Sequence, residues 1–337
     1  MKWRTEDGST GRLLQYCAAY FLLYVVTGVS VKYFQGPANA GYPGFTSLQY
    51  LIFSTLSSAL VCLGVIVAGG WFRGTVKSEV PMIMLSGACT AVVIPTTTLM
   101  YTLPISVMVA MVIMRGSVIV ISRAVDWVLH LQGISGKKVV WQENVAAAVA
   151  TVAVGLHLLL AKSSDFDFIH DAAATAILGS YMLAYAIRIY LMNRFKFTRS
   201  PASSSNNLSY FAVEQFTASG LMFGAVGAAL AFPEFLPVLR ETVETPPDGW
   251  RWAAVSGISF GASAFFSVFL FMFKGRSSTF AGLTNRLASL IAGTIATVIS
   301  AAFFYGDYPK PLDWLSLALI LVAVCFLADA EEANRGA

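Results

Sequence analysis

Apolar stretches of about twenty residues recur along nearly the whole chain, and this pattern leaves few folds open. Each stretch is long enough to cross the hydrocarbon core of a bilayer as a helix. Hydrophobic residues make up 57% of the chain and charged residues only 12%, about half of their share in an ordinary soluble domain. The sequence therefore predicts an all-α polytopic membrane protein. The ten predicted spans are 13–34, 47–70, 80–101, 103–122, 143–161, 171–192, 207–231, 251–273, 278–303 and 311–328.

Basic residues are distributed unevenly between the two sets of alternate loops. Of the 22 Lys and Arg residues, 14 lie on the side that holds both termini and five on the other, which leaves three within the spans. Because cytoplasmic loops are enriched in Lys and Arg, both termini are predicted to be cytoplasmic. This bias explains the net charge of +4 without a nucleic-acid partner.

The sequence lacks the motifs of several kinds of site. All four cysteines fall within apolar spans and without metal-ligand spacing, so we predict neither disulfides nor a metal site. No hydrolase motif and no phosphate-binding loop is present. We therefore expect no cofactor and no catalytic residues, and the chain is not predicted to be an enzyme.

Ten spans divide into two sets of five. If the two sets are homologous, an odd number in each inserts them with opposite orientation, which is the inverted-repeat plan of secondary transporters. A polar stretch at 162–171 marks the seam. The predicted five-helix repeats are residues 1–162 and 163–337, so that the fourth span corresponds to the ninth.

The fourth and ninth spans each carry an arginine. Arg115 lies eight residues before Arg123, and Arg286 lies eight residues after Ser278, each counted from the predicted cytoplasmic end. At 1.5 Å per residue, both lie on the order of 12 Å from that end. An arginine inside a span costs roughly 2.5–3.5 kcal/mol on insertion scales, so it is expected to face a partner or a water-filled cavity. Two such cations predict one anionic ligand; structural pairing, or snorkelling to the interface, is the alternative.

One face of the ninth span is small and polar. At about 100° per residue, this face holds Gly282, Asn285, Arg286, Ser289 and Gly293. Small residues allow helices to approach closely in a membrane. The face is therefore expected either to meet a neighbouring helix or to line a pathway for an anion.

Three short motifs lie in three of the predicted spans. Residues 282–286 read Gly-Leu-Thr-Asn-Arg in the ninth span, Asn206-Asn207 begins the seventh, and Arg115-Gly116 follows a proline in the fourth. These motifs resemble the Gly-Ala-Leu-Asn-Lys motif, the second half of the Phe-Tyr-Asn-Asn motif, and the proline-led helix with an inward Lys-Asn pair of nucleotide-sugar transporters. The chain thus resembles the drug/metabolite transporter superfamily, with transporters of the GDP-mannose type as the nearest fit.

This resemblance implies an alternating-access carrier that exchanges a nucleotide sugar for a nucleoside monophosphate. Its partners would be the lipid bilayer and a small anionic substrate, in the Golgi or endoplasmic reticulum membrane of a eukaryote or the inner membrane of a bacterium, and a homodimer is left open. In the family, the two asparagines contact the polar part of the substrate and the ninth helix contacts its sugar and phosphate end. The implied substrate-binding residues are Arg115, Asn206, Asn207, Gly282, Asn285 and Arg286.

Two departures from the family motifs matter for the substrate. Ser204-Ser205 replaces the Phe-Tyr pair, so an aromatic surface on which a base stacks is missing there. Arg286 replaces a lysine, which keeps the charge and favours bidentate binding of phosphate. An anionic substrate is therefore better supported than any particular base or sugar. For Asn206-Asn207, a loop and helix cap is the alternative role.

Other functions stay open on the residues alone. A face of the fourth span rich in methionine (Met108, Met111 and Met114) would suit an exporter of drug-like or amino-acid-like solutes, because flexible thioethers adapt to varied ligands. A non-transporting scaffold, in which Arg115 and Arg286 brace the bundle, is a third class.

Two further predictions concern polar residues within the spans. Arg188 and Glu214 are predicted to form a structural ion pair between adjacent helices, with proton coupling as the alternative. Tyr20 and Tyr24 are expected to pack with their hydroxyls paired, with the lining of a cavity as the alternative.

Overall fold

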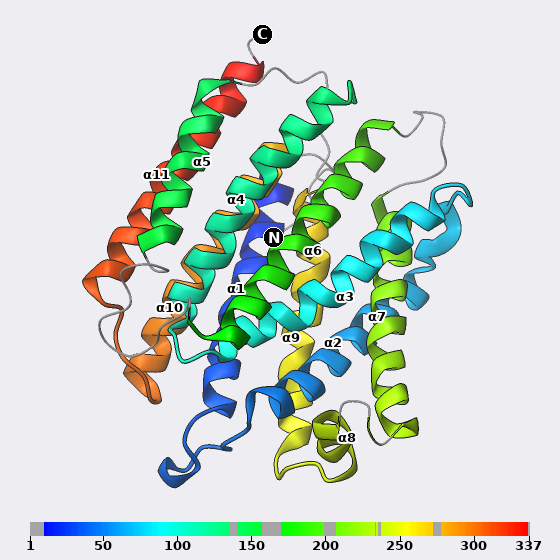
Figure 1. Ribbon diagram of the computed structural model, residues 1–337, viewed down its shortest axis with the longest axis vertical. Helices are drawn as coiled ribbons and strands as arrows, with labels where there is room; N and C mark the ends of the chain where they lie inside the picture. Colours follow the sequence, from blue (N-terminus) through cyan, green and yellow to red (C-terminus); the bar gives the residue numbers. More distant parts are fainter. Residues whose placement is uncertain are drawn as a thin grey trace. The chain divides into compact units, whose positions relative to one another are not determined.

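The chain is helical throughout the part that its computed structural model describes, residues 10–134, 140–156, 170–198, 207–232, 234, 237–271 and 278–335 (Figure 1). No strand occurs in these residues. The longer helices are α1 (Thr10–Phe34), α2 (Ser47–Gly69), α3 (Val80–Thr102), α4 (Val107–Leu131), α5 (Trp141–Gly155), α6 (Ala172–Thr198), α7 (Asn207–Ala231), α9 (Trp250–Phe271), α10 (Ser278–Phe303) and α11 (Pro311–Arg335). The short helices are η1 (Ala38–Ala40), η2 (Trp71–Gly74) and α8 (Pro237–Glu244).

Eight helices in the described ranges are long and apolar enough to cross a membrane: α1, α2, α3, α4, α6, α9, α10 and α11. They are the helices of an integral multi-pass membrane protein. α5 is described over only 15 residues, and α7 carries the buried polar side chains of Glu214 and Gln215, which lower its hydropathy. Each predicted span overlaps one helix, but the count of ten membrane crossings stays a prediction.

Local sequence sets the ends of the helices that carry the predicted site. Ser106 caps α4 by accepting a hydrogen bond from the Val109 amide at 3.1 Å, so α4 begins later than the predicted residue 103. It also continues past the predicted end at residue 122, because Val125 and Leu129 pack in the interior one turn apart. Arg115 therefore lies in the third turn of a 25-residue helix, well before its C-terminal end.

Two compact units share the chain, and each takes segments from both of its halves. Unit 1 comprises Met1–Val25, Ile105–Ala172 and Ser263–Ala337, and unit 2 comprises Val26–Pro104 and Ala173–Ala262. Unit 1 thus holds α4, α5, α10 and α11, whereas unit 2 holds α2, α3, α7 and most of α9. The predicted boundary at residue 162 concerns repeats in the sequence and not these units, and it stays a prediction.

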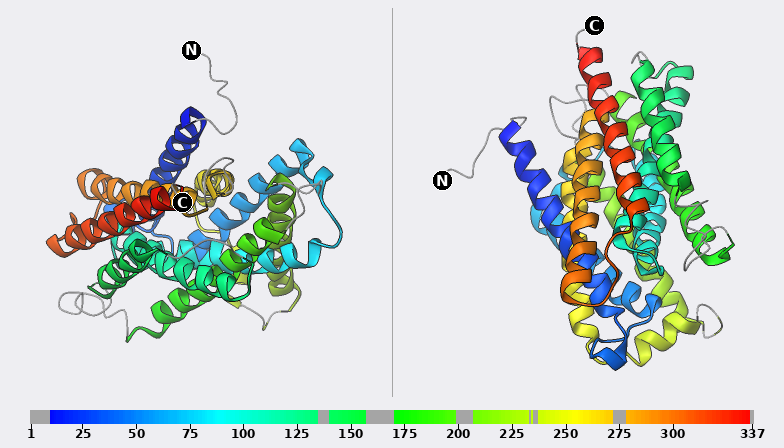
Figure 2. Two further views of the ribbon diagram at one scale, coloured as in Figure 1. Left: turned by 90° about the horizontal axis from the view of Figure 1, so that it is seen from above. Right: turned by 90° about the vertical axis from the view of Figure 1, so that its left-hand side faces the viewer.

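Helix α4 forms the core of unit 1. With 72% of its apolar window buried, it is packed more deeply than the other candidate spans of the described residues. α5 lies beside it and beside α11, and Figure 2 shows α10 and α11, the orange and red helices, side by side. Gly293 of α10 faces Met111 of α4, where a Cβ would lie 2.6 Å from the methionine Cγ. A small residue at this position lets α4 and α10 approach closely.

Two glycines allow close helix packing in unit 2. A Cβ at Gly87 of α3 would lie 2.6 Å from the carbonyl oxygen of Glu214 in α7. A Cβ at Gly257 of α9 would overlap the carbonyl oxygen of Ser54 in α2. All four residues are the eighth of their helices, counted from the bounds given above. The same contact is thus made twice, each time between the second long helix of one half of the chain and the third of the other.

We expect Gly257→Ala to lower the free energy of unfolding by about 1–3 kcal/mol, because the new methyl group would force two backbones apart. Gly220→Ala is the matched control, since a Cβ at Gly220 of α7 meets no atom within 4 Å. Its effect should stay within about 0.5 kcal/mol. Unfolding in mixed detergent micelles measures both, and equal effects would contradict the close packing of α9 on α2.

Candidate functional site

Arg115 of α4 is buried against two tyrosines of α1. Its side chain is part of a residue only 4% exposed, and its Nη2 donates hydrogen bonds to the Tyr24 hydroxyl at 2.7 Å and to the Tyr20 hydroxyl at 3.3 Å. The guanidinium carbon also lies 5.4 Å from the centroid of the Tyr24 ring, within the range of a cation–π interaction. The tyrosine hydroxyls are paired, which confirms the prediction made for them.

Asn285 of α10 extends this group of polar residues. Its Oδ1 accepts a hydrogen bond from the Tyr20 hydroxyl at 3.3 Å, and its Nδ2 donates to Ser267 Oγ of α9 at 3.1 Å. Asn285 is completely buried. Tyr20, Tyr24, Arg115 and Asn285 are called the Arg115 cluster below. Through it, α1, α4, α9 and α10 share one continuous set of hydrogen bonds within unit 1.

Arg286, the next residue of α10, binds α4 directly. Its Nη2 donates to the Val118 carbonyl oxygen at 3.3 Å and to Ser122 Oγ. Val118 and Ser122 lie three and seven residues after Arg115, so they share its face of α4. The structure therefore brings both predicted arginines to the same pair of helices, but gives each its own hydrogen-bond partners.

The hydrogen-bond acceptors named for these two arginines are uncharged. Hydroxyl and carbonyl oxygens satisfy the hydrogen-bonding geometry of a guanidinium group, yet they do not cancel its charge. In surroundings of low dielectric constant, such a charge acts over a longer range than in water. The interior of unit 1 between α4 and α10 is thus suited to an anion.

The remaining predicted site residues lie elsewhere in the chain. Asn207 is the first residue of α7 and belongs to unit 2. Gly282 lies within α10, one turn before Arg286. Asn206 and most of the predicted seam, residues 162–169, lie outside the described residues. The structure thus brings together Arg115, Asn285 and Arg286 of the six.

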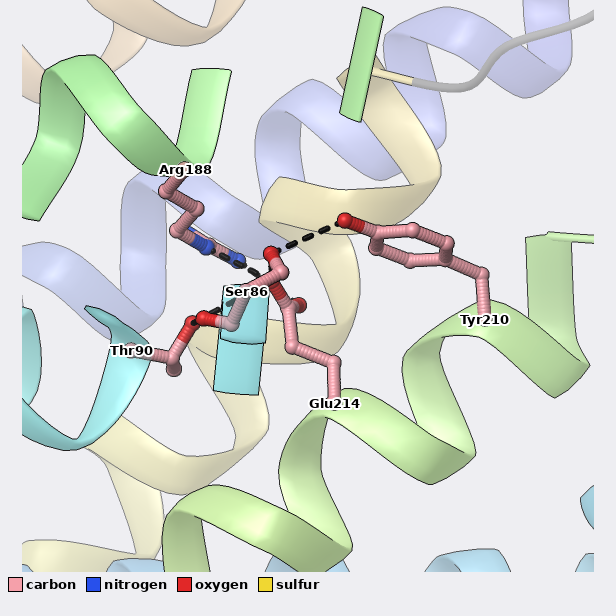
Figure 3. Close-up of polar contacts among 5 residues, drawn as sticks. All are labelled: Ser86, Thr90, Arg188, Tyr210 and Glu214. Carbon is pink, nitrogen blue, oxygen red and sulfur yellow. Dashed lines mark hydrogen bonds and ion pairs between the residues drawn. The ribbon is translucent and has the colours of Figure 1, made fainter. Parts of the chain in front are cut away.

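Unit 2 holds a separate buried cluster built on an ion pair (Figure 3). Arg188 of α6 donates from Nε to Glu214 Oε1 of α7 at 2.8 Å and from Nη2 to Oε2 at 3.0 Å. This parallel pair of hydrogen bonds is the bidentate geometry of the strongest arginine–carboxylate contacts. The predicted ion pair is confirmed.

Hydroxyl groups complete this cluster from two directions, as Figure 3 shows. Ser86 Oγ and Thr90 Oγ1 of α3 donate to Glu214 Oε1 at 2.6 and 3.2 Å. The Tyr210 hydroxyl donates to Ser86 Oγ at 2.8 Å. Glu214 therefore accepts four hydrogen bonds, and the arrangement joins α3, α6 and α7 as a structural brace.

Sequence reasoning did not identify the tyrosines as partners of Arg115, although a signal is present. Tyr20 and Tyr24 are four residues apart and so lie on one face of α1, with ring centroids 4.6 Å apart. The same spacing recurs in α6, where the rings of Tyr181 and Tyr185 lie 5.1 Å apart. A repeated pair of aromatic residues in the first helix of each half marks a position with a specific role.

Comparisons with known proteins do not add to this picture. No family model matches the chain, and no curated protein matches its sequence. The resemblance to nucleotide-sugar transporters therefore rests on the short motifs. Among the described residues, no group of three or more His, Cys, Asp and Glu side chains could hold a metal ion.

Proposed function

We propose that the protein is a secondary membrane transporter that carries an anionic, phosphorylated metabolite by alternating access. The observation that supports this most is the pair of buried arginines on α4 and α10, whose named hydrogen-bond acceptors are neutral. A phosphate group offers several charged oxygens that guanidinium groups bind well. The resemblance of residues 282–286 to the nucleotide-sugar motif makes a nucleotide sugar, exchanged for a nucleoside monophosphate, the proposed substrate pair.

The ten-span, inverted-repeat architecture is part of this proposal. Three equivalences between the halves support it: the Gly87–Glu214 and Gly257–Ser54 contacts, the paired tyrosines of α1 and α6, and the two arginines. Arg115 and Arg286 are each the ninth residue of their helix. Each compact unit also contains corresponding helices of both halves, α4 and α5 with α10 and α11, or α2 and α3 with α7 and α9. Inverted repeats that exchange helices in this way are typical of alternating-access carriers.

Of the alternatives, the scaffold has one observation in its favour. Arg286 donates to the backbone of α4 at the Val118 carbonyl, which is how a bracing residue binds a neighbouring helix. The exporter has less support. Met108, Met111 and Met114 are fully buried, and Met111 packs against Gly293, so these side chains fill a core.

An exchange assay on the purified protein tests the proposal. In proteoliposomes, we expect uptake of labelled GDP-mannose to be faster into vesicles preloaded with guanosine monophosphate than into empty vesicles. An obligatory exchanger returns to the outward-facing state fastest when a substrate occupies its site. Equal uptake into empty and preloaded vesicles would contradict exchange, and uptake no greater than into protein-free vesicles would contradict transport of this substrate.

A further inference from the structure

Unit 2 carries a groove between the last turns of α1 and the first turns of α9. Its volume is about 520 Å³, within the range of pockets that bind small ligands. Val26 and Phe34 line it from α1, and Trp252 and Val255 line it from α9. The residues belong to two helices that are candidate membrane spans.

The wall of this groove is apolar in its chemistry. Two serines of α9 are part of it, but Ser256 Oγ donates to the Ala253 carbonyl at 2.7 Å and Ser259 Oγ donates to the Ser256 carbonyl at 2.8 Å. Their hydroxyl hydrogens are thus used within the helix. Trp252 is 70% exposed, and Val255 is 51% exposed. Exposed apolar side chains on a spanning helix face lipid hydrocarbon, so the groove suits an alkyl chain.

A smaller polar hollow of about 340 Å³ adjoins the groove and shares Gly249 and Trp252 with it. Asp248 and Arg251 both line this hollow and are exposed, and the Arg251 guanidinium lies 5.7 Å from the centroid of the Trp250 ring. Because α9 begins here, the positive end of its dipole adds to the charge of Arg251. The hollow therefore offers a positive site and a negative site side by side, next to an apolar groove.

We propose that this composite site binds a glycerophospholipid with a zwitterionic headgroup, such as phosphatidylethanolamine. One acyl chain lies in the groove, the phosphate lies at Arg251, and the ammonium lies at Asp248. The two tryptophans at the start of α9 are typical of the level at which lipid headgroups begin. A second copy of the chain would need a flat or protruding apolar surface, whereas a concave groove with a charged mouth matches a lipid. This inference does not depend on the transport proposal.

Fluorescence quenching by brominated lipid tests the site in the full-length protein. In nanodiscs of phosphatidylglycerol with increasing mole fractions of phosphatidylethanolamine brominated on its acyl chains, the Trp252 signal is the difference between wild type and Trp252→Phe. We expect half-maximal quenching of Trp252 at a mole fraction about three- to tenfold below that for random contact, as two weak exposed charge contacts would give. Trp314 of α11, which is 47% exposed, should follow random contact.

Matched variants separate the site from general lipid contact. Val255→Phe fills the groove and should abolish the preference, whereas Val322→Phe, at a residue of α11 that is 45% exposed, should retain it. Arg251→Gln should weaken the preference about threefold. Trp252 quenching that follows that of Trp314 would overturn the proposal, as would equal preference for brominated phosphatidylglycerol. Loss of a protein dimer in Val255→Phe, with no lipid preference in the wild type, would assign the groove to a second copy and also overturn it.

Discussion

Removing one charge of the Arg188–Glu214 pair is expected to lower the free energy of unfolding by about 3–5 kcal/mol. Arg188 is 9% exposed and Glu214 is completely buried, so neither charge is solvated once its partner is gone. Glu214→Gln keeps the shape of the side chain and two of its possible contacts, yet it leaves a buried arginine without a counter-charge. Arg188→Met leaves the carboxylate with only the hydroxyl groups of Ser86 and Thr90. Both single changes should therefore be severe.

The double variant Arg188→Met with Glu214→Leu should cost clearly less than the sum of the single changes, because no charge is left uncompensated. Tyr210→Phe is the control inside the same cluster: it removes one neutral hydrogen bond, to Ser86, and should cost only about 0.5–1.5 kcal/mol. Detergent-titration unfolding of the four proteins measures these free energies. Charge-removing variants no less stable than Tyr210→Phe would show that water reaches the pair and that it does not brace the three helices.

The helices could be predicted from sequence because each span is a long apolar run, and such runs have one stable form in a bilayer. Their ends were less predictable. The fourth span was placed at residues 103–122, whereas Ser106 caps α4 and buried Val125 and Leu129 extend it to Leu131. The short helix α8 was not predicted, because Pro237–Glu244 is too short and too polar to form an apolar span.

The candidate site was predictable in part for a related reason. A charged residue in an apolar span stands out by composition, so Arg115, Arg188, Glu214 and Arg286 could all be found, and the Arg188–Glu214 contact followed from opposite charges in neighbouring helices. The partners of Arg115 could not be found in this way. Tyr20 is 95 residues away from it, and its contact depends on how α1 packs beside α4. The two interleaved units likewise depend on contacts between remote segments.

The arginines of unit 1 give the second large expected effect. If Arg115 and Arg286 bind one phosphate-bearing ligand, each charge-assisted contact should contribute about 1.5–3 kcal/mol, which corresponds to roughly ten- to a hundredfold in Kd. Arg115→Gln and Arg286→Gln should each weaken the binding of GDP-mannose by that factor. In the double variant the loss should be smaller than the sum, because residues that share one partner are not additive.

Arg286→Lys is the gentler probe, because it keeps the charge while it removes the planar fork that binds Val118 and Ser122. We expect it to bind GDP-mannose better than Arg286→Gln does. Arg123→Gln is the matched control, since it removes one positive charge from the same helix at a residue that bonds the Asn144 side chain near the surface. Its affinity should equal that of the wild type.

Calorimetry on these variants, together with their unfolding midpoints in detergent, separates an anion site from a brace. A shared anion site predicts non-additive losses of affinity with modest changes in stability, because the neutral partners of Arg115 and Arg286 leave no buried carboxylate behind among the contacts described above. A brace predicts the reverse: Arg286→Gln would lower the unfolding midpoint, while whatever affinity the wild type has would be retained. Strict additivity of the two Gln changes, or an Arg286→Gln variant that binds as well as Arg286→Lys, would show that the two guanidinium groups do not converge on one phosphate.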